Sequence, residues 1–116
     1  MTERSSPPLS PPVYHVLLAI GGEALHGYAI MQRFGELLEG AEQILPGTLY
    51  ATLARMVRQG LIEETRAPRG EESGGPPRRH YRLTARGRAA AQAETERMRR
   101  LVAVARRRAW LPGLAR

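Results

Sequence analysis

The sequence predicts a mainly α-helical fold with a small β-hairpin, arranged as a winged helix-turn-helix followed by a long C-terminal helix. Three short amphipathic segments, each closed by glycine, occupy residues 11–60. Two extended runs around a Gly/Pro-rich stretch follow, and a proline-free segment rich in Ala, Arg and Glu comes last. The 116 residues leave room for one domain. Three helices followed by a hairpin is the winged helix-turn-helix order, with one helix added.

The N-terminal segment combines a flexible arm with a first short helix. Residues 1–10 are rich in Ser and Pro and are expected to be mobile. The helix begins after Ser10, a good N-cap, with Pro11 and Pro12 in its first turn. One apolar stripe at helical spacing is formed by Val13, Val16, Leu17 and Ile20.

Two more helices are expected before the hairpin. The second spans about 26–39, and its inward residues are Ile30, Phe34, Leu37 and Leu38. The third begins at Pro46 and Gly47 and ends at Gly60. Its inward side is formed by Leu49, Leu53, Met56 and Val57.

A hairpin and a long helix complete the predicted fold. The extended runs 61–66 and 79–83 flank the breaker-rich stretch APRGEESGGPP, which predicts a hairpin with a flexible tip. Thr84 is a natural N-cap for a helix that continues to about residue 110, where Pro112 and Gly113 stop it. The division expected is a flexible arm, a winged helix-turn-helix domain, a C-terminal helix and a tail, at 1–10, 11–84, 85–111 and 112–116.

Charge is distributed unevenly along the chain. All 18 basic residues are Arg and all 11 acidic residues are Glu, for a net charge of +7. Residues 1–65 hold four Arg and seven Glu (4 − 7 = −3), and residues 66–116 hold fourteen and four (14 − 4 = +10). This asymmetry favours a polyanionic partner, nucleic acid or a membrane surface, and a solvated, soluble surface is the alternative.

Neither a membrane segment nor an enzyme is indicated. No apolar run approaches the roughly 18 residues of a membrane span, and the start MTERSSPPLSPP has no apolar signal core, so we expect a cytoplasmic protein. The absence of Asp and Cys excludes a Ser/His/Asp relay, a thiol nucleophile and a thiolate zinc site. His15, His26 and His80 are far apart in the sequence, so no metal or cofactor is expected.

The third helix has the two faces that a DNA-reading helix needs. Its outward side is free of acidic and bulky aliphatic residues and carries Thr48, Ala51, Thr52, Arg55 and Gln59. Thr and Gln can form hydrogen bonds with base edges or phosphates, and one Arg side chain can donate two hydrogen bonds to a single guanine. We therefore expect a recognition helix, against the alternative of an ordinary amphipathic surface helix.

Flanking residues add to this interface. Tyr50 lies at the boundary of the two faces, where it either bonds a phosphate or packs over the second helix. The turn at Gly47 leaves backbone N–H groups free at a helix N-terminus, which suits an anion. Arg78 and Arg79, beyond the hairpin tip, can reach a phosphate backbone or the minor groove.

Three stretches, LHGYAIMQRF, LPGTLYATLARMVRQGLIEE and RRHYRLTARG, in this order and spacing resemble the PadR family of winged-helix transcriptional regulators. The resemblance covers roughly residues 13–100 and is to the short branch with a single C-terminal helix. It implies a homodimeric repressor with the third helix in the major groove and the wing alongside. DNA contacts implied by position fall on Thr48, Tyr50, Arg55, Arg78 and Arg79. In the motif at His26, Gly27 and Tyr28, the tyrosine packs or meets phosphate.

The long helix predicts self-association. Its apolar stripe, interrupted by Glu94, consists of Ala91, Met98, Leu101, Val102, Ala105 and Ala109. An apolar stripe that extends beyond a small domain needs a partner to cover it, and a second copy of the chain is the simplest one. We expect the stripe to pack on the first helix and then to cross to the other protomer, which places two recognition helices about 34 Å apart.

Trp110, off this stripe, has two interpretations. Some short-branch PadR-like proteins bind flat hydrophobic compounds at the dimer centre, so the resemblance implies a possible aromatic effector site near Trp110. The alternative is end-packing beside Pro112.

The function expected is sequence-specific binding of a double-stranded DNA operator by a homodimeric repressor that an effector relieves. The alternatives are a basic RNA-binding or ribosome-associated module, and a protein-interaction module acting through the long helix. The chain lacks the clustered aromatics that stack on single-stranded bases, which disfavours the RNA alternative.

Overall fold

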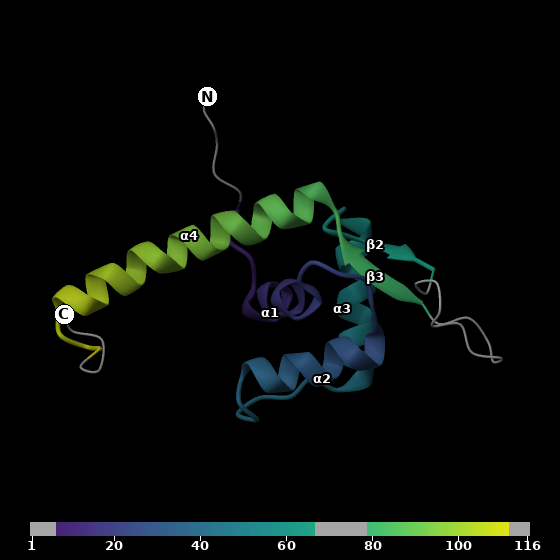
Figure 1. The fold of residues 1–116 in the computed structure, drawn as a ribbon, viewed down its shortest axis with the longest axis horizontal. Helices are drawn as coiled ribbons and strands as arrows, with labels where there is room; N and C mark the ends of the chain where they lie inside the picture. The colour runs from purple at the N-terminus through teal and green to yellow at the C-terminus, as the bar shows by residue number, and fades with distance from the viewer. Residues whose placement is uncertain (1–6, 67–78, 112–116) are drawn as a thin grey trace.

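The structure, a computed structural model, describes residues 7–66 and 79–111 (Figure 1). Along these residues run α1 (Pro11–Ile20), β1 (Leu25–His26), α2 (Gly27–Leu37), α3 (Pro46–Arg58), β2 (Ile62–Thr65), β3 (His80–Leu83) and α4 (Ala85–Arg107). The predicted fold class, a winged helix-turn-helix with a long added helix, is confirmed. Most of the predicted arm, the hairpin tip with Arg78, and the tail lie outside the described residues.

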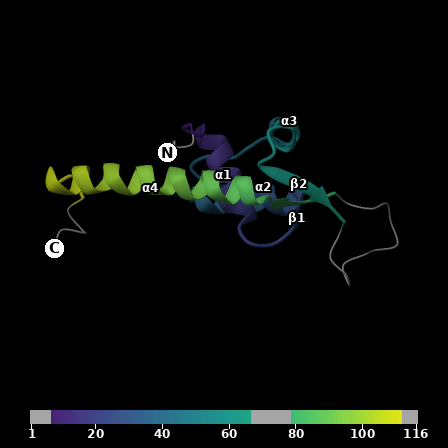
Figure 2. The ribbon, with the colours of Figure 1, turned by 90° about the horizontal axis from the view of Figure 1, so that it is seen from above.

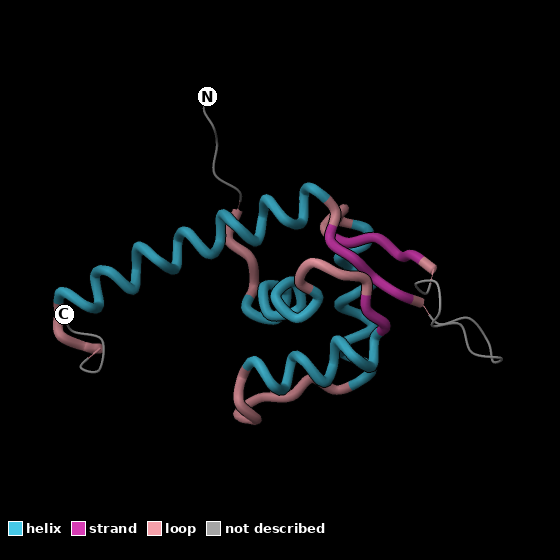
Figure 3. Tube along the Cα trace, viewed as in Figure 1, coloured by secondary structure: helices cyan, strands magenta, loops and turns pink. Residues whose placement is uncertain are grey.

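A small antiparallel sheet stands beside the helices (Figure 3). Its strand order is β1-β3-β2, with Ile62 opposite Leu83 and His26 opposite His80. The strand β1 was not predicted, because two residues are too few to show a period. This short strand joins the start of α2 to β3, so the second helix and the wing share one hydrogen-bonded frame.

The core forms around α1, which lies between α4 and α2 in Figure 1. Each of the three remaining helices and the sheet contributes side chains to it. Its most deeply buried members are Val16, Leu17, Ile20, Ile30, Leu49, Leu53, Met56 and Ile62. Burying one such aliphatic side chain contributes about 1.5–3 kcal/mol, so this cluster is the main source of stability.

One residue expected to point inward does not. Leu37 is 46% exposed, whereas Leu38 packs against the core as the chain leaves α2. The helix ends at Leu37, and the turn that follows changes which of the two leucines faces the core.

Both ends of α3 are set by backbone chemistry. Pro46 occupies its first turn, and the N-cap residue Leu45 provides no side-chain hydrogen bond. At the other end, Gly60 adopts a left-handed φ of 77°. The N–H of Gly60 donates to Val57 O and that of Leu61 to Met56 O, each at 3.0 Å. This pair of bonds is a Schellman cap, which glycine permits without strain.

The start of α4 is bonded to this cap. Thr84 is the N-cap of α4, as predicted, and its hydroxyl accepts from the N–H of Gly87 at 3.0 Å. The same hydroxyl donates to Gly60 O at 2.6 Å, and the Thr84 N–H donates to Leu61 O at 3.1 Å. A Cβ on Gly87 would overlap the Leu61 carbonyl. We call this set, Gly60, Leu61, Thr84 and Gly87, the α3–α4 joint.

Further along, α4 is held by α1 and by the segment before it. The hydroxyls of Tyr14 and Thr95 share a hydrogen bond of 2.6 Å. The N–H of Leu9 donates to the Glu94 carboxylate at 3.0 Å, and Arg97 pairs with the same carboxylate. Glu94, which interrupts the apolar stripe, is thus an anchoring residue.

The end of α4 differs from the expectation. The helix stops at Arg107, and Ala109 lies outside it with a φ of 63°. The N–H of Trp110 donates to Ala105 O at 3.0 Å, and that of Ala109 to Arg106 O at 2.9 Å. Placing Ala109 on the helical stripe was therefore wrong. A Schellman cap ends the helix before Pro112, although the left-handed conformation costs a non-glycine residue about 1 kcal/mol.

We predict that Gly87→Ala destabilises the fold by about 1–3 kcal/mol, because the new Cβ meets backbone that cannot rotate away. The control is Gly35→Ala in α2, where no atom beyond the neighbouring residues and the helix's own backbone lies within 4 Å of the added Cβ. That change is expected to stabilise by about 0.5–1 kcal/mol, as alanine usually does in a helix. Urea unfolding followed by circular dichroism measures both, and equal effects would contradict the close approach at Leu61.

The contribution of Glu94 to the stability of the fold should depend on pH. Hydrogen bonds from Arg97, and then from the Leu9 N–H, lower the Glu94 pKa below its ordinary 4.5. Its contribution is therefore complete above about pH 4.5 and is lost as the pH falls through the lower, folded-state pKa. We predict that wild type exceeds Glu94→Gln in melting temperature at pH 6 and that the gap narrows towards pH 3. Glu36→Gln, at an exposed site, is the control and should match wild type at pH 6.

Candidate nucleic-acid interface

One side of α3 is exposed and carries no acidic residue. The exposed side chains are Thr48, Tyr50, Ala51, Ala54, Arg55, Arg58 and Gln59, and Gly47 is exposed in the first turn. The buried side, formed by Leu49, Leu53 and Met56, fixes the rotation of the helix. In the described part of the chain, no carboxylate pairs with Arg55 or Arg58. The surface therefore presents small groups and two uncompensated guanidinium groups to solvent.

Thr52 is a correction to the predicted face. It is only 3% exposed, and its hydroxyl donates to Thr48 O at 2.8 Å. Thr52 comes three residues after Leu49 and four before Met56, a spacing that places it on the buried stripe. Its hydroxyl is satisfied within the helix, so placing Thr52 on the exposed face was wrong.

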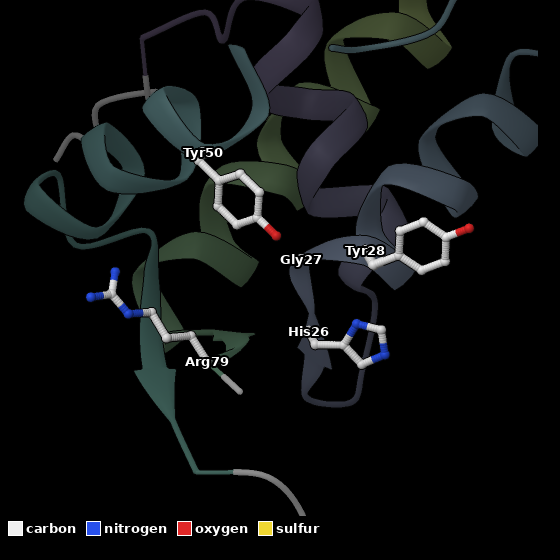
Figure 4. Close-up of a pocket in the computed structure, with 5 residues that line it drawn as sticks. All are labelled: His26, Gly27, Tyr28, Tyr50 and Arg79. Carbon is white, nitrogen blue, oxygen red and sulfur yellow. The ribbon is translucent and has the colours of Figure 1, made fainter. Parts of the chain in front are cut away.

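A pocket of about 410 Å³ lies beside α3, where the N-termini of α2 and α3 approach the wing (Figure 4). It is lined by His26, Gly27, Tyr28, Tyr50 and Arg79. Figure 4 shows the Tyr50 hydroxyl pointing towards Gly27, between Tyr28 and Arg79. Tyrosine hydroxyls and a guanidinium are hydrogen-bond donors, and none of the five lining residues is acidic. The three donor groups point in different directions (Figure 4), and the acid-free lining is compatible with an anion.

Gly27 lets the Tyr50 ring pack against α2. A Cβ at this position would lie 2.7 Å from Cε1 and Cζ of Tyr50, so only glycine lets the ring rest there. Packing over α2 is one of the two roles predicted for Tyr50, and the phosphate contact stays a prediction. Because the side chain remains 48% exposed, its hydroxyl still reaches the pocket.

His26 is a structural residue that sequence spacing did not identify. Its Nδ1 accepts from the N–H of Ala29 at 3.2 Å and so caps α2. The ring lies nearly parallel to that of Tyr28, with centroids 6.5 Å apart, and edge-on to His80 at 5.5 Å. Histidine is an uncommon N-cap, and only the HGY motif pointed to this position.

Arg79 and its neighbours form the wing side of the pocket. The Arg79 guanidinium is 3.7 Å from the Glu64 carboxylate across the β2–β3 ladder, and the arginine is exposed. Burial raises the pKa of Tyr81, although a hydrogen bond from Arg79 opposes the shift. Tyr81 therefore stays protonated at neutral pH and acts as a core residue, while Arg79 remains at the surface.

The outer half of α4 is an exposed apolar surface. Figures 1 and 2 both show it projecting beyond α1. Met98, Leu101 and Val102 are exposed there, Leu101 at 69%, and Ala105 is half-buried. Trp110 is also 69% exposed, so end-packing does not bury it.

The described residues contain no group of three or more His or Glu side chains placed to hold a metal ion. No helix in these ranges is both long and apolar enough to cross a membrane.

The fold and the exposed third helix together define a winged-helix transcriptional regulator. Residues 16–93 match the Transcriptional regulator PadR-like family, and the chain belongs to this family. This confirms the resemblance seen in its sequence motifs. No curated protein sequence matches the chain significantly.

Several solved structures of similar fold are PadR regulators. A PadR family transcription regulator from Clostridium difficile R20291 is 25% identical, with a TM-score of 0.66 over 80% of this chain and 92% of the other. One from Eggerthella lenta DSM 2243 is 27% identical, with a TM-score of 0.60 over 79% and 74%. Bacillus subtilis PadR in complex with operator DNA is 20% identical, with a TM-score of 0.62 over 72% and 46%. This chain thus aligns with less than half of the Bacillus protein.

Proposed function

We propose that the protein is a homodimeric repressor that binds a double-stranded DNA operator through α3. The observation that carries the proposal is the exposed, acid-free face of α3 beside a pocket compatible with an anion. In this proposal Thr48 and Arg55 meet base edges in the major groove, and the N–H groups around Gly47 meet a phosphate. The operator complex of Bacillus subtilis PadR, which shares the fold, supports a duplex DNA partner.

The pocket supplies the proposed backbone contacts. In this proposal the hydroxyl groups of Tyr28 and Tyr50 and the guanidinium of Arg79 donate hydrogen bonds to the phosphate backbone beside the groove. Arg78, the next residue along the wing, is proposed for the same backbone on sequence grounds. Phosphate contacts set affinity and position, whereas the α3 side chains set sequence preference.

A second copy of the chain is the proposed partner of the outer half of α4. Exposed Leu101 and Val102 would lose water contact on pairing, together with Met98 and Ala105. Pairing also supplies two α3 helices for a two-fold operator. Trp110 remains our proposed position for a flat aromatic effector near the dimer centre.

Replacing Arg55 with alanine should separate base reading from general attraction. We expect a loss of about 1–3 kcal/mol in affinity for a duplex that the wild type selects from a randomised pool, with relaxed preference at one base pair. Arg79→Ala should weaken all duplexes alike and lower the salt slope by about one. Titrations across salt concentrations measure both effects.

Arg33→Ala is the matched control. Arg33 lies on α2 and pairs with Glu23, so the change removes one positive charge away from α3. It should change affinity far less than Arg55→Ala. If Arg55→Ala and Arg79→Ala both bind as wild type does, the groove assignment is wrong. Preference for single-stranded RNA over the duplex in the same assay would instead favour an RNA-binding module.

Dimerisation is expected to depend on the apolar side of α4. Leu101→Glu places a charge at the centre of the proposed interface and should yield a monomer in sedimentation velocity. Ala103→Glu, about 200° around the helix from Leu101, is the control and should remain a dimer. A Leu101→Glu protein that still sediments as a dimer would exclude this face as the interface.

A further inference from the structure

The α3–α4 joint connects two helices that the proposed function uses for different tasks. Figure 1 shows the end of α3 and the start of α4 meeting beside the sheet. Gly60 and Leu61 cap α3, and their carbonyl groups accept hydrogen bonds from Thr84, the N-cap of α4, at 2.6 and 3.1 Å. The last turn of the third helix and the first turn of the long helix are therefore bonded through a single residue.

The Thr84 hydroxyl is fixed in both directions. It accepts from the Gly87 N–H and donates to Gly60 O, so its one proton is committed to the α3 cap. Gly87 permits the close approach of the two backbones, because a Cβ at this position would overlap the Leu61 carbonyl. The hydrogen bonds of Thr84 and the close packing of Gly87 on Leu61 together fix the first turn of α4 against the α3 cap.

The other anchors of α4 act on different elements. Thr95 bonds Tyr14 of α1, and Glu94 bonds the N–H of Leu9. These contacts hold α4 to α1 and to the segment before it, whereas the joint contacts the C-terminal cap of the third helix. Only the joint therefore ties the direction of α4 to the position of α3 through hydrogen bonds that the described residues make.

We propose that Thr84 is a positioning residue that sets the spacing between the two DNA half-sites. The inference rests on the proposed function, namely a dimer joined through α4 with one α3 in each half-site. If α4 fixes where the partner lies and Thr84 fixes α3 relative to α4, then Thr84 determines the separation and relative rotation of the two α3 helices. A rigid pair accepts one spacer length, and a loosened pair accepts several.

Three substitutions separate the two roles of the Thr84 hydroxyl. Thr84→Ser keeps the acceptor for Gly87 and the donor to Gly60. Thr84→Asp keeps the helix cap, since aspartate is a strong N-cap, but removes the proton donated to Gly60 O. Thr84→Val removes both. If the Thr84→Val protein folds poorly, Thr84→Asp still tests the loss of the hydrogen bond to Gly60 O. Thr95→Val is the matched control, because it removes a hydroxyl from α4 that does not contact α3.

The probe is a duplex that the wild-type dimer selects from a randomised pool, remade with one or two base pairs inserted or deleted between its half-sites. Each base pair shifts a half-site by about 3.4 Å and rotates it by about 35°. We expect wild type, Thr84→Ser and Thr95→Val to bind the altered spacers at least about tenfold more weakly than the selected one. For Thr84→Asp and Thr84→Val we expect differences below about threefold. The ratio within each variant is the readout, so a uniform effect of the added charge cancels.

The outcomes separate the inference from the function on which it rests. Wild-type spacing selectivity that Thr84→Asp retains would overturn the positioning role of Thr84. Equal loss of selectivity in Thr95→Val, or failure of Thr84→Ser to retain it, would overturn it as well. If the wild type recovers no two-fold duplex, the proposed function fails and the inference fails with it.

Discussion

Burial of the apolar stripe of α1 is the interaction on which the rest of the structure depends. Val16, Leu17 and Ile20 are almost completely buried, and α2, α4 and β3 pack around this helix. Removing so much aliphatic surface from water is the largest favourable term available to a chain of this size. Because α1 takes the central place, α3 lies at the periphery with one side open, and α4 can cover α1 with only its first half.

The two exposed surfaces that remain differ in chemistry. The open side of α3 is small and polar and carries Arg55 and Arg58, whereas the outer half of α4 exposes Leu101 and Val102, and Trp110 is exposed just beyond its end. The first surface suits a polyanion, and the second suits an apolar partner. A single chain thus separates a charged binding surface from an associating surface, and Thr84 lies between them.

Several arginines are paired with glutamates within the described residues. Glutamates pair with arginines on α2, on the sheet and along α4, as with Glu63 and Arg82 at 2.6 Å and Glu96 and Arg99 at 2.7 Å. Such exposed pairs each contribute little to stability. Their effect is on the distribution of charge. Because α3 has no carboxylate of its own, the positive charges of its guanidinium groups are not offset by a neighbouring acidic side chain.

The sequence by itself determined the order of helices, the glycine at the end of α3, the Thr84 cap and the acid-free side of α3. These depend on local rules, namely helical periodicity, capping chemistry and residue type, which act over a few neighbouring residues. The tertiary structure alone decided the rest. The pairing of β1, the outward turn of Leu37 and the end of α4 before Ala109 depend on which surfaces meet and where the backbone finds partners. Likewise, Gly27 beneath Tyr50 and Gly87 against Leu61 are required by residues distant in sequence, and local pattern carries no record of such contacts.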